Sequence, residues 1–274
     1  MKKLVSFLTV AFLSIMSAIP TVLAAQPVEK QINFQPPVTS IHEDVWRFHE
    51  LLLPIIIGIT LFVLALLLYV MIRFRKSANP VPSKTSHNIF IEIIWTIVPV
   101  IILIIIAIPS FRLLYHHHQV EDAEMTINVS GYQWYWGYEY PDHGNFSFLS
   151  YMVPDEDLKE GQPRLLQTDT EMVIPVDTKV RLVITGKDVI HSWTIPAFGV
   201  KKDAVPGHFN EIWFEVNKEG VYYGQCSEIC GTGHGFMPIT VRVVSKEEFE
   251  NWVSWAQDEY ASLDTLNKIK FASK

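Results

Sequence analysis

The chain has 274 residues, is 49% apolar and carries a formal net charge of −7. This length allows one or two domains, and the acidic balance argues against nucleic acid as a partner. The apolar share is too high for a wholly soluble protein with 19% charged residues, and it is concentrated in a few uninterrupted stretches.

The N-terminus is typical of a bacterial signal peptide. Lys2 and Lys3 form a positive start, Leu4 to Ile19 are apolar, and small residues follow at Val22 to Ala25. Residues 1–25 are therefore predicted to be a signal peptide cleaved after either alanine at its end, and an uncleaved extra span is the alternative. No cysteine follows the cleavage site, which excludes a lipoprotein precursor. Residues 26–44 form a polar external segment.

Residues 45–115 are predicted to be a transmembrane helical hairpin. Leu51 to Ile72 and Ile93 to Phe111 contain no charged residue. Each is long enough to cross a hydrocarbon core of about 30 Å as a helix. We place the two spans at about 48–72 and 90–112.

The loop between the spans predicts the orientation of the hairpin. It carries Arg73, Arg75, Lys76 and Lys84, with no acidic residue from 73 to 90. Short basic loops stay on the cytoplasmic side, so both ends of the mature chain are expected outside, on a bacterial inner membrane.

Residues 116–245 change to short segments rich in Val, Ile, Trp, Tyr and Phe, which favours a β-sandwich or barrel. The predicted strands are Met125–Tyr132, Gln133–Tyr140, Glu171–Pro175, Lys179–Thr185, Ile190–Pro196, Glu211–Val216, Gly220–Gln225 and Pro238–Val244. The polar segment 142–170 is predicted to be a long excursion from the sheet. From 118 onward the chain has 13 Lys and Arg against 24 Asp and Glu, a surface that favours a basic partner.

A C-terminal helix and tail are predicted over residues 246–274. Ser245 and Glu248 match a capping box. Phe249, Trp252, Val253 and Ala256 fall on one face of that helix, which we expect to pack on the β domain or on another subunit.

The two cysteines of the chain, Cys226 and Cys230, lie in one short segment with His234 and Met237. Thiolate, imidazole and thioether ligands suit copper better than calcium or magnesium. A disulfide is the alternative, but it would close a very short loop and leave the His and Met unexplained. His191, at the start of a predicted strand, is a further candidate ligand. A mononuclear blue-copper site needs only one Cys, so the second argues for a binuclear, thiolate-bridged centre.

This segment resembles the CuA motif of cytochrome c oxidase subunit II. The signal peptide, the hairpin and three further segments, 131–136, 188–193 and 203–207, occur in the order of that family. The resemblance implies an all-β cupredoxin-like Greek-key sandwich or barrel attached to the N-terminal two-helix transmembrane hairpin. It also implies a subunit of a respiratory oxidase that takes electrons from cytochrome c and passes them to a haem in subunit I. Oxygen is then reduced to water in that subunit, with coupled proton translocation.

The resemblance further implies a role for each ligand. Cys226 and Cys230 would bridge two copper ions, and His191 and His234 would each bind one. Met237 would be a weak ligand to one ion, and the Glu228 carbonyl a ligand to the other. The Glu228 carboxylate would bind a magnesium or manganese ion shared with subunit I, because a carboxylate suits that harder ion.

Other residues are assigned through the same resemblance. Trp134 would receive electrons, Glu139 and Asp188 would help to dock a basic cytochrome c, and Glu92 would admit protons to a channel in subunit I. Further docking acids are Asp155, Glu156 and Asp157. The implied partners are oxidase subunits I and III, with haems in a partner subunit.

Two features depart from the family. His208 stands where the family usually has Arg, and His116, His117 and His118 form a triplet that we interpret as interfacial. Two other functions stay open. A membrane-tethered copper chaperone would have a thioredoxin-like fold, and a quinol oxidase subunit of the same fold would lack the copper ligands.

Overall fold

The computed structural model describes residues 26–118, 120 and 122–272. The predicted signal peptide lies outside them. Contacts divide the chain into two units, one formed by residues 40–119 and the other by the remainder.

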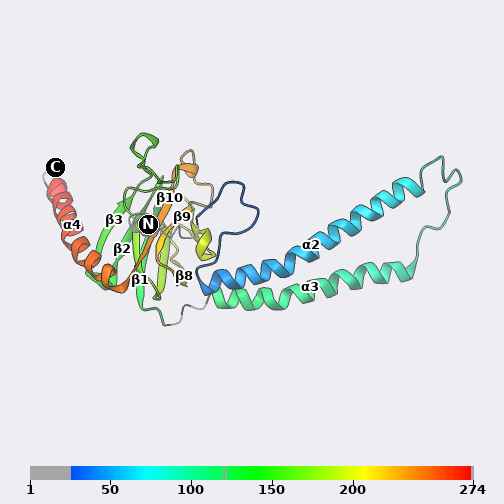
Figure 1. Cartoon of the computed structure of the whole chain (residues 1–274), viewed down its shortest axis with the longest axis horizontal. Helices are drawn as coiled ribbons and strands as arrows, with labels where there is room; N and C mark the ends of the chain where they lie inside the picture. Colours follow the sequence, from blue (N-terminus) through cyan, green and yellow to red (C-terminus); the bar gives the residue numbers. More distant parts are fainter. Residues whose placement is uncertain (1–25, 119, 121, 273–274) are drawn as a thin grey trace, which may run out of the picture. The chain divides into compact units, whose positions relative to one another are not determined.

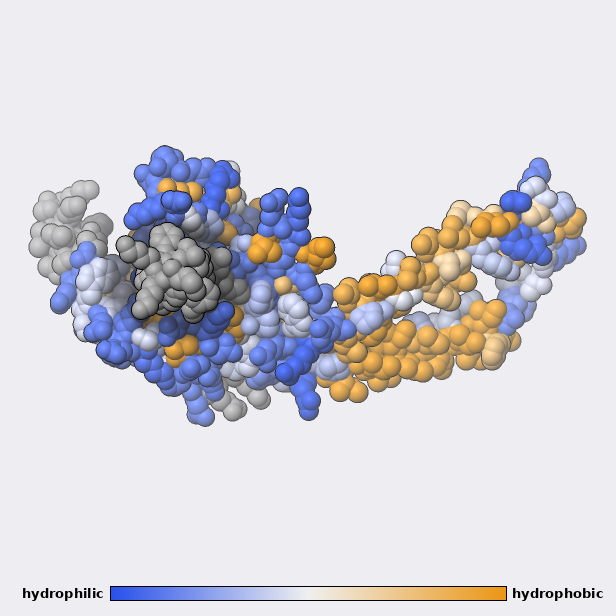
Figure 2. Space-filling view, in the orientation of Figure 1, coloured by the Kyte–Doolittle hydropathy of each residue, from blue (hydrophilic) through white to orange (hydrophobic). Residues whose placement is uncertain are grey.

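The first unit is a hairpin of two long helices, α2 (Ser40–Arg73) and α3 (Ile89–His118), which run side by side (Figure 1). Asn88 caps α3, because its side-chain oxygen accepts hydrogen bonds from the backbone N–H groups of Phe90 and Ile91. Both helices are long and apolar enough to cross a membrane, and neither apolar window is buried within the chain. Hydrophobic residues cover the hairpin (Figure 2), as expected for helices that face lipid.

The second unit is built on a five-stranded sheet of order β3-β2-β1-β5-β8. Its strands are β1 (Met125–Tyr132), β2 (Tyr135–Tyr140), β3 (Phe146–Ser150), β5 (Lys179–Gly186) and β8 (Asn210–Glu215). Burial alternates along β1, whose Met125, Ile127 and Val129 are buried between half-exposed polar residues. This period of two places every second side chain in the core. β1 pairs parallel with β5, and the other pairs are antiparallel.

Two smaller sheets complete the domain. One has the order β4-β10-β9 and the other joins β6 to β7. Their strands are β4 (Met172–Pro175), β6 (His191–Ile195), β7 (Val200–Ala204), β9 (Gly220–Gln225) and β10 (Pro238–Val244). Tyr140 links the layers, because its buried hydroxyl donates to the carbonyl of Val173 and accepts from the N–H of that residue. Trp193 stacks on Phe214 in the shared core, at 6.0 Å between ring centroids. The result is the predicted β-sandwich following two apolar helices.

The prediction for residues 142–170 was wrong in part. Phe146 to Ser150 form β3 on the edge of the large sheet, with Phe146 and Phe148 buried. The alternation of Phe with Ser is a strand pattern, but its polar flanks conceal it. β7 was also missed, because its central Lys201, Lys202 and Asp203 give no apolar signal.

The C-terminal helix α4 (Lys246–Ala272) begins as predicted. The hydroxyl of Ser245 accepts a hydrogen bond from the N–H of Glu248 (3.1 Å). Phe249, Val253 and Ala256 are buried, and Trp252 contacts the aromatic rings of β2 and β3. The apolar face therefore packs on the sheet. Elsewhere in the described residues lie four short 3-10 turns: η1 (Pro141–His143), η2 (Asp155–Asp157), η3 (Pro196–Phe198) and η4 (His234–Phe236).

Candidate metal centre

The segment with the two cysteines is the loop that joins β9 to β10, and it is fixed at both ends. The N–H of Cys226 donates to the carbonyl of Met237 (3.0 Å), which closes the loop on itself. The N–H of Ser227 donates to the carbonyl of Ser192 (2.9 Å), which fastens the loop to the strand that begins with His191. These backbone bonds bring an upstream histidine to a downstream cysteine loop.

A glycine allows this close approach of β9 to β6. A Cβ at Gly224 would collide with the backbone carbonyl of Thr194. The position therefore requires glycine, and a side chain there would push β6 and its His191 away from the loop.

The structure brings four of the predicted ligands together. Cys226 Sγ lies 3.7 Å from Cys230 Sγ. Nδ1 of His191 lies 3.9 Å from Cys226 Sγ, and Nδ1 of His234 lies 3.6 Å from Cys230 Sγ. Each thiol thus has its own imidazole. The ligand atoms of His191 and the two cysteines all lie within 4.8 Å of one another, and these three residues are buried.

The donor set fits copper and does not fit a disulfide. Both cysteines are free, and their sulfur separation is far beyond the S–S bond length of about 2.05 Å. Two sulfurs side by side, each with one imidazole, match a thiolate-bridged pair of soft metal ions. In a buried site of this kind, calcium or magnesium would find too few oxygen ligands.

The two remaining predicted ligands also lie at this loop. The side chain of Met237 is 1% exposed, directly before β10. The carbonyl oxygen of Glu228 lies 3.4 Å from Cys226 Sγ, and the Glu228 side chain is exposed to solvent. The carbonyl of Glu228 therefore lies at the thiol of Cys226, whereas its carboxylate is in solvent. The two groups are thus separate enough for two different ligand roles.

Asp188 holds His191 from the side opposite to the cysteines. Its Oδ1 lies 2.8 Å from His191 Nε2, so Nδ1 of the ring is left to face Cys226. The backbone N–H groups of Val189 and Gln133 donate to the same carboxylate. Partial burial opposes ionisation of Asp188, but these hydrogen bonds outweigh it and lower the pKa of the carboxyl. A charged carboxylate behind a ligating histidine fixes the ring and raises its basicity.

The two thiols differ in acidity. Burial opposes ionisation of Cys226, but the hydrogen bond with His191 and those with the backbone outweigh it and lower the pKa of this thiol. Burial and the charge of Cys226 raise the pKa of Cys230. A bound cation removes the repulsion between two neighbouring thiolates, so the pair is suited to a metal that holds both.

Trp134 lies against the loop, as its predicted role requires. Its Nε1–H donates to the carbonyl oxygen of Cys230 (3.1 Å). Its ring covers Gly231 and Gly233, where a Cβ would meet the indole. The tryptophan is half-exposed, so it connects the protein surface with a candidate ligand.

Sequence reasoning missed Gln133. Its side-chain amide donates to the same Cys230 carbonyl (2.9 Å), while its backbone N–H donates to Asp188 Oδ2 (2.7 Å). Gln133 therefore joins the tryptophan side of the centre to the histidine side. No local pattern marks such a residue, because its partners are 97 and 55 residues away along the chain.

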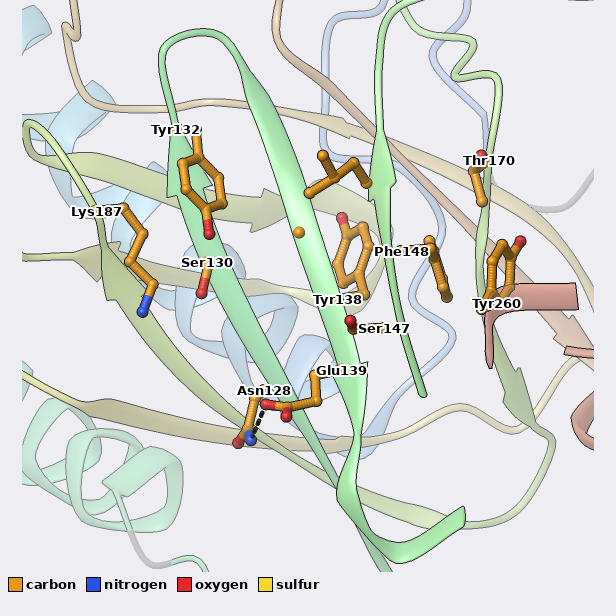
Figure 3. Close-up of a pocket in the computed structure, with 12 residues that line it drawn as sticks. Asn128, Ser130, Tyr132, Tyr138, Glu139, Ser147, Phe148, Thr170, Lys187 and Tyr260 are labelled. Carbon is orange, nitrogen blue, oxygen red and sulfur yellow. Dashed lines mark hydrogen bonds between the residues drawn. The ribbon is translucent and has the colours of Figure 1, made fainter. Parts of the chain in front are cut away.

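Glu139 lies on the outer face of β2, away from the ligands. It accepts a hydrogen bond from Asn128 (2.8 Å) in a groove of about 560 Å³ that Ser130, Tyr132 and Lys187 also line (Figure 3). Among the described residues, Glu139 contacts none of the candidate copper ligands.

The other predicted residues lie elsewhere. Glu92 is in the first turn of α3, where the helix dipole favours an acid. His208 is exposed between β7 and β8. His116 Nδ1 lies 3.1 Å from Asp44 Oδ2, a contact that joins α3 to α2.

Two family models match successive parts of the chain. The family model for the periplasmic domain of cytochrome c oxidase subunit II matches residues 125–244. The model for the transmembrane domain of the same subunit matches residues 27–113, so the two apolar helices form a membrane anchor.

Relatives match along most of the chain. A probable cytochrome c oxidase subunit 2 of Rickettsia bellii is 56% identical over 231 residues, which cover 84% of this chain and 86% of that protein. The cytochrome c oxidase subunit 2 of Oenothera berteroana is 48% identical over 237 residues, which cover 84% of this chain and 91% of that protein. Among solved structures, the periplasmic domain of subunit II of cytochrome oxidase (CoxB) of Bradyrhizobium japonicum is 52% identical. The matched part covers 52% of this chain and 99% of the solved chain, with a TM-score of 0.49.

Proposed function

The chain belongs to the cytochrome c oxidase subunit II family, and from that premise we propose that the loop between β9 and β10, with His191, holds the copper centre of a terminal respiratory oxidase. The chain takes electrons from reduced cytochrome c at this centre and passes them to haem in subunit I. Oxygen reduction to water and proton translocation follow in the partner subunit.

One observation carries this proposal: two free thiols lie 3.7 Å apart and each has an imidazole beside it. Cys226 and Cys230 would hold both metal ions, with His191 and His234 as the imidazole ligands. Met237 and the carbonyl of Glu228 would complete the set. Copper held in this way supplies a one-electron carrier.

The residues around the centre suit a site that transfers electrons and does not bind or convert a substrate. The buried ligands and the carboxylate of Asp188 fix the donors, so little reorganisation is needed when charge arrives. Every proposed position is taken by a protein ligand, and a closed set leaves no place for a substrate such as oxygen. Oxygen is therefore reduced in subunit I.

Trp134 is the residue through which electrons reach the centre. Its half-exposed side chain can meet a donor, and its Nε1–H donates a hydrogen bond to the carbonyl of Cys230. The acidic outer domain would attract a basic cytochrome c. We propose Glu139 and Asp188 as docking residues, with Asp155, Glu156 and Asp157 as further candidates.

Three finer assignments complete the proposal. The exposed carboxylate of Glu228 binds magnesium or manganese shared with subunit I, because a hard ion prefers oxygen. Glu92, at the start of α3, admits protons to subunit I. Subunit III and haem-carrying subunit I are the partners in a bacterial inner membrane, with the basic loop between α2 and α3 inside and both chain ends outside.

The two alternative functions receive no support. A copper chaperone of the thioredoxin-like kind is at odds with a β-sandwich, and a quinol oxidase subunit would lack the thiol pair that this chain retains.

Metal analysis and electron paramagnetic resonance of the purified oxidase test the proposal. We expect two copper ions per chain in this subunit and a mixed-valence signal shared equally by two nuclei. The complex should also oxidise reduced cytochrome c. A single copper, or none in a well-folded complex, would refute the binuclear centre, and oxidation of quinol alone would refute the donor.

A further inference from the structure

A second cavity lies within the helical hairpin, far from the copper ligands in sequence. It measures about 440 Å³ and opens between α2 and α3. Arg47, Arg112 and Asp44 line it together with the apolar residues Phe48, Leu51, Ile108, Pro109 and Leu113. The cavity thus has a charged part, with two arginines and one aspartate, and an apolar part.

The position of the cavity corresponds to a membrane surface. Arg47 precedes the uncharged stretch that starts at Leu51, and Arg112 directly follows the one that ends at Phe111. Both arginines are therefore at the same end of the hairpin, the end from which the chain continues into the β domain. At this depth, headgroups meet the hydrocarbon region, and basic side chains reach toward the headgroups.

Of the two arginines at the cavity, Arg47 is the one that pairs with acids. Asp44 is shared by Arg47 (3.4 Å) and His116 (3.1 Å), and Arg47 also reaches Glu43 (3.5 Å). Arg112 is exposed and has no hydrogen bond or ion pair among the described residues of the chain. An anion is the complement of this arginine, and phosphate is the group that a guanidinium binds best.

We propose that this cavity binds one membrane phospholipid with a single net negative charge. Its phosphate lies at Arg112, with Arg47 nearby, and its glycerol and first acyl carbons lie against Phe48, Leu51 and Ile108. The apolar wall distinguishes this ligand from a free phosphate ion, which would gain nothing from it. The lipid would seal the outer end of the hairpin in the assembled oxidase.

Titration of the purified, delipidated oxidase with phosphatidylglycerol, followed by native mass spectrometry, tests this inference. We expect one tightly retained phosphatidylglycerol that Arg112→Gln weakens by about fivefold or more, the effect of one arginine at a lipid surface. Ile108→Trp, which fills the apolar part, should weaken it as well. Arg75→Gln, which removes the same charge from the loop at the other end of the hairpin, should leave that lipid bound.

A second measurement applies even if a variant fails to assemble. Phosphatidylglycerol with a photoactivatable group near the glycerol should label residues 47–51 or 108–113 of the unaltered oxidase, and inorganic phosphate at equal concentration should not compete. Equal retention in the Arg112→Gln and Arg75→Gln complexes would overturn the proposal. So would labelling confined to other subunits, because a partner subunit would then fill the cavity.

Discussion

His191 and Asp188 form a carboxylate–imidazole pair, with 2.8 Å between Nε2 and Oδ1, and the other ring nitrogen, Nδ1, lies toward Cys226. The pair gives Asp188 a role that its sequence position did not predict. It was assigned to docking, yet its carboxylate is engaged with a candidate copper ligand.

Asp188→Asn tests which role matters. Both carboxylate oxygens accept N–H groups, Oδ1 from His191 and Oδ2 from Gln133. In asparagine, the NH₂ group would replace one of these oxygens. That group is a donor, so it could not accept the hydrogen bond from His191 or Gln133. We expect copper affinity to fall about 10- to 100-fold, measured by competition with a chelator in the purified oxidase.

Glu139→Gln is the matched control, because Glu139 is also a predicted docking acid but contacts Asn128 instead of a ligand. It should leave copper affinity unchanged. If Asp188→Asn also kept its copper and altered only the salt dependence of cytochrome c oxidation, the role in holding His191 would be wrong.

Cys226→Ser tests the bridge. Serine offers a hard, protonated oxygen in place of a soft thiolate, so it cannot hold two copper ions together. We expect copper in this subunit to fall from two ions to one or none, with loss of the shared signal and of respiration with cytochrome c. Copper content and electron paramagnetic resonance report this.

Thr232→Ala provides the control for that variant, because Thr232 is exposed in the same loop. It should retain both copper ions. A Cys226→Ser oxidase that kept a two-nucleus signal would contradict the bridging role.

The sequence predicted most of the fold where local patterns are strong. Met125–Tyr132, Gly220–Gln225 and Pro238–Val244 are strands with the predicted bounds. Turn residues delimit them, and each has enough apolar residues to show a buried face. β7 could not be predicted, because it is a strand through its pairing with β6 and not through its own composition.

The candidate site also has a part that the sequence predicted and a part that it did not. Cys226, Cys230 and His234 were predicted from donor chemistry within one segment, and His191 from the need for a further ligand. The hydrogen bonds that organise them, from Gln133 to Cys230 and from Asp188 to His191, depend on how separate loops meet. Such contacts follow from the tertiary fold and leave no periodic trace in the sequence.

Trp134→Phe tests the path of electrons to the centre. Phenylalanine keeps an aromatic ring but loses the Nε1–H that donates to Cys230. We expect a loss of about 0.5–1.5 kcal/mol in unfolding free energy and slower reduction of the copper centre by cytochrome c, with copper still bound. Stopped-flow reduction measures the rate.

Trp255→Phe makes the same chemical change on α4, where the side chain is 52% exposed and contacts the ring of Tyr260. Its oxidase should be reduced at the normal rate. Equal rates for both variants would remove Trp134 from the path.

Gly233→Ala tests whether contact between the tryptophan and the loop is needed. A Cβ at Gly233 would collide with Trp134 Cδ2, whereas a Cβ at Gly235 would meet nothing within 4 Å. Both glycines lie in the same loop, so the pair of variants separates this contact from the general cost of alanine.

We expect Gly233→Ala to displace the indole from the Cys230 carbonyl, because a well-packed site cannot absorb an extra methyl group. The cost in unfolding free energy should be about 1–3 kcal/mol. Reduction by cytochrome c should slow while both copper ions stay bound, and Gly235→Ala should behave as the unaltered chain does. If Gly233→Ala were reduced as fast as Gly235→Ala, close packing of Trp134 on the loop would not govern electron transfer. A loss of copper in Gly233→Ala alone would instead show that the glycine shapes the ligand loop itself.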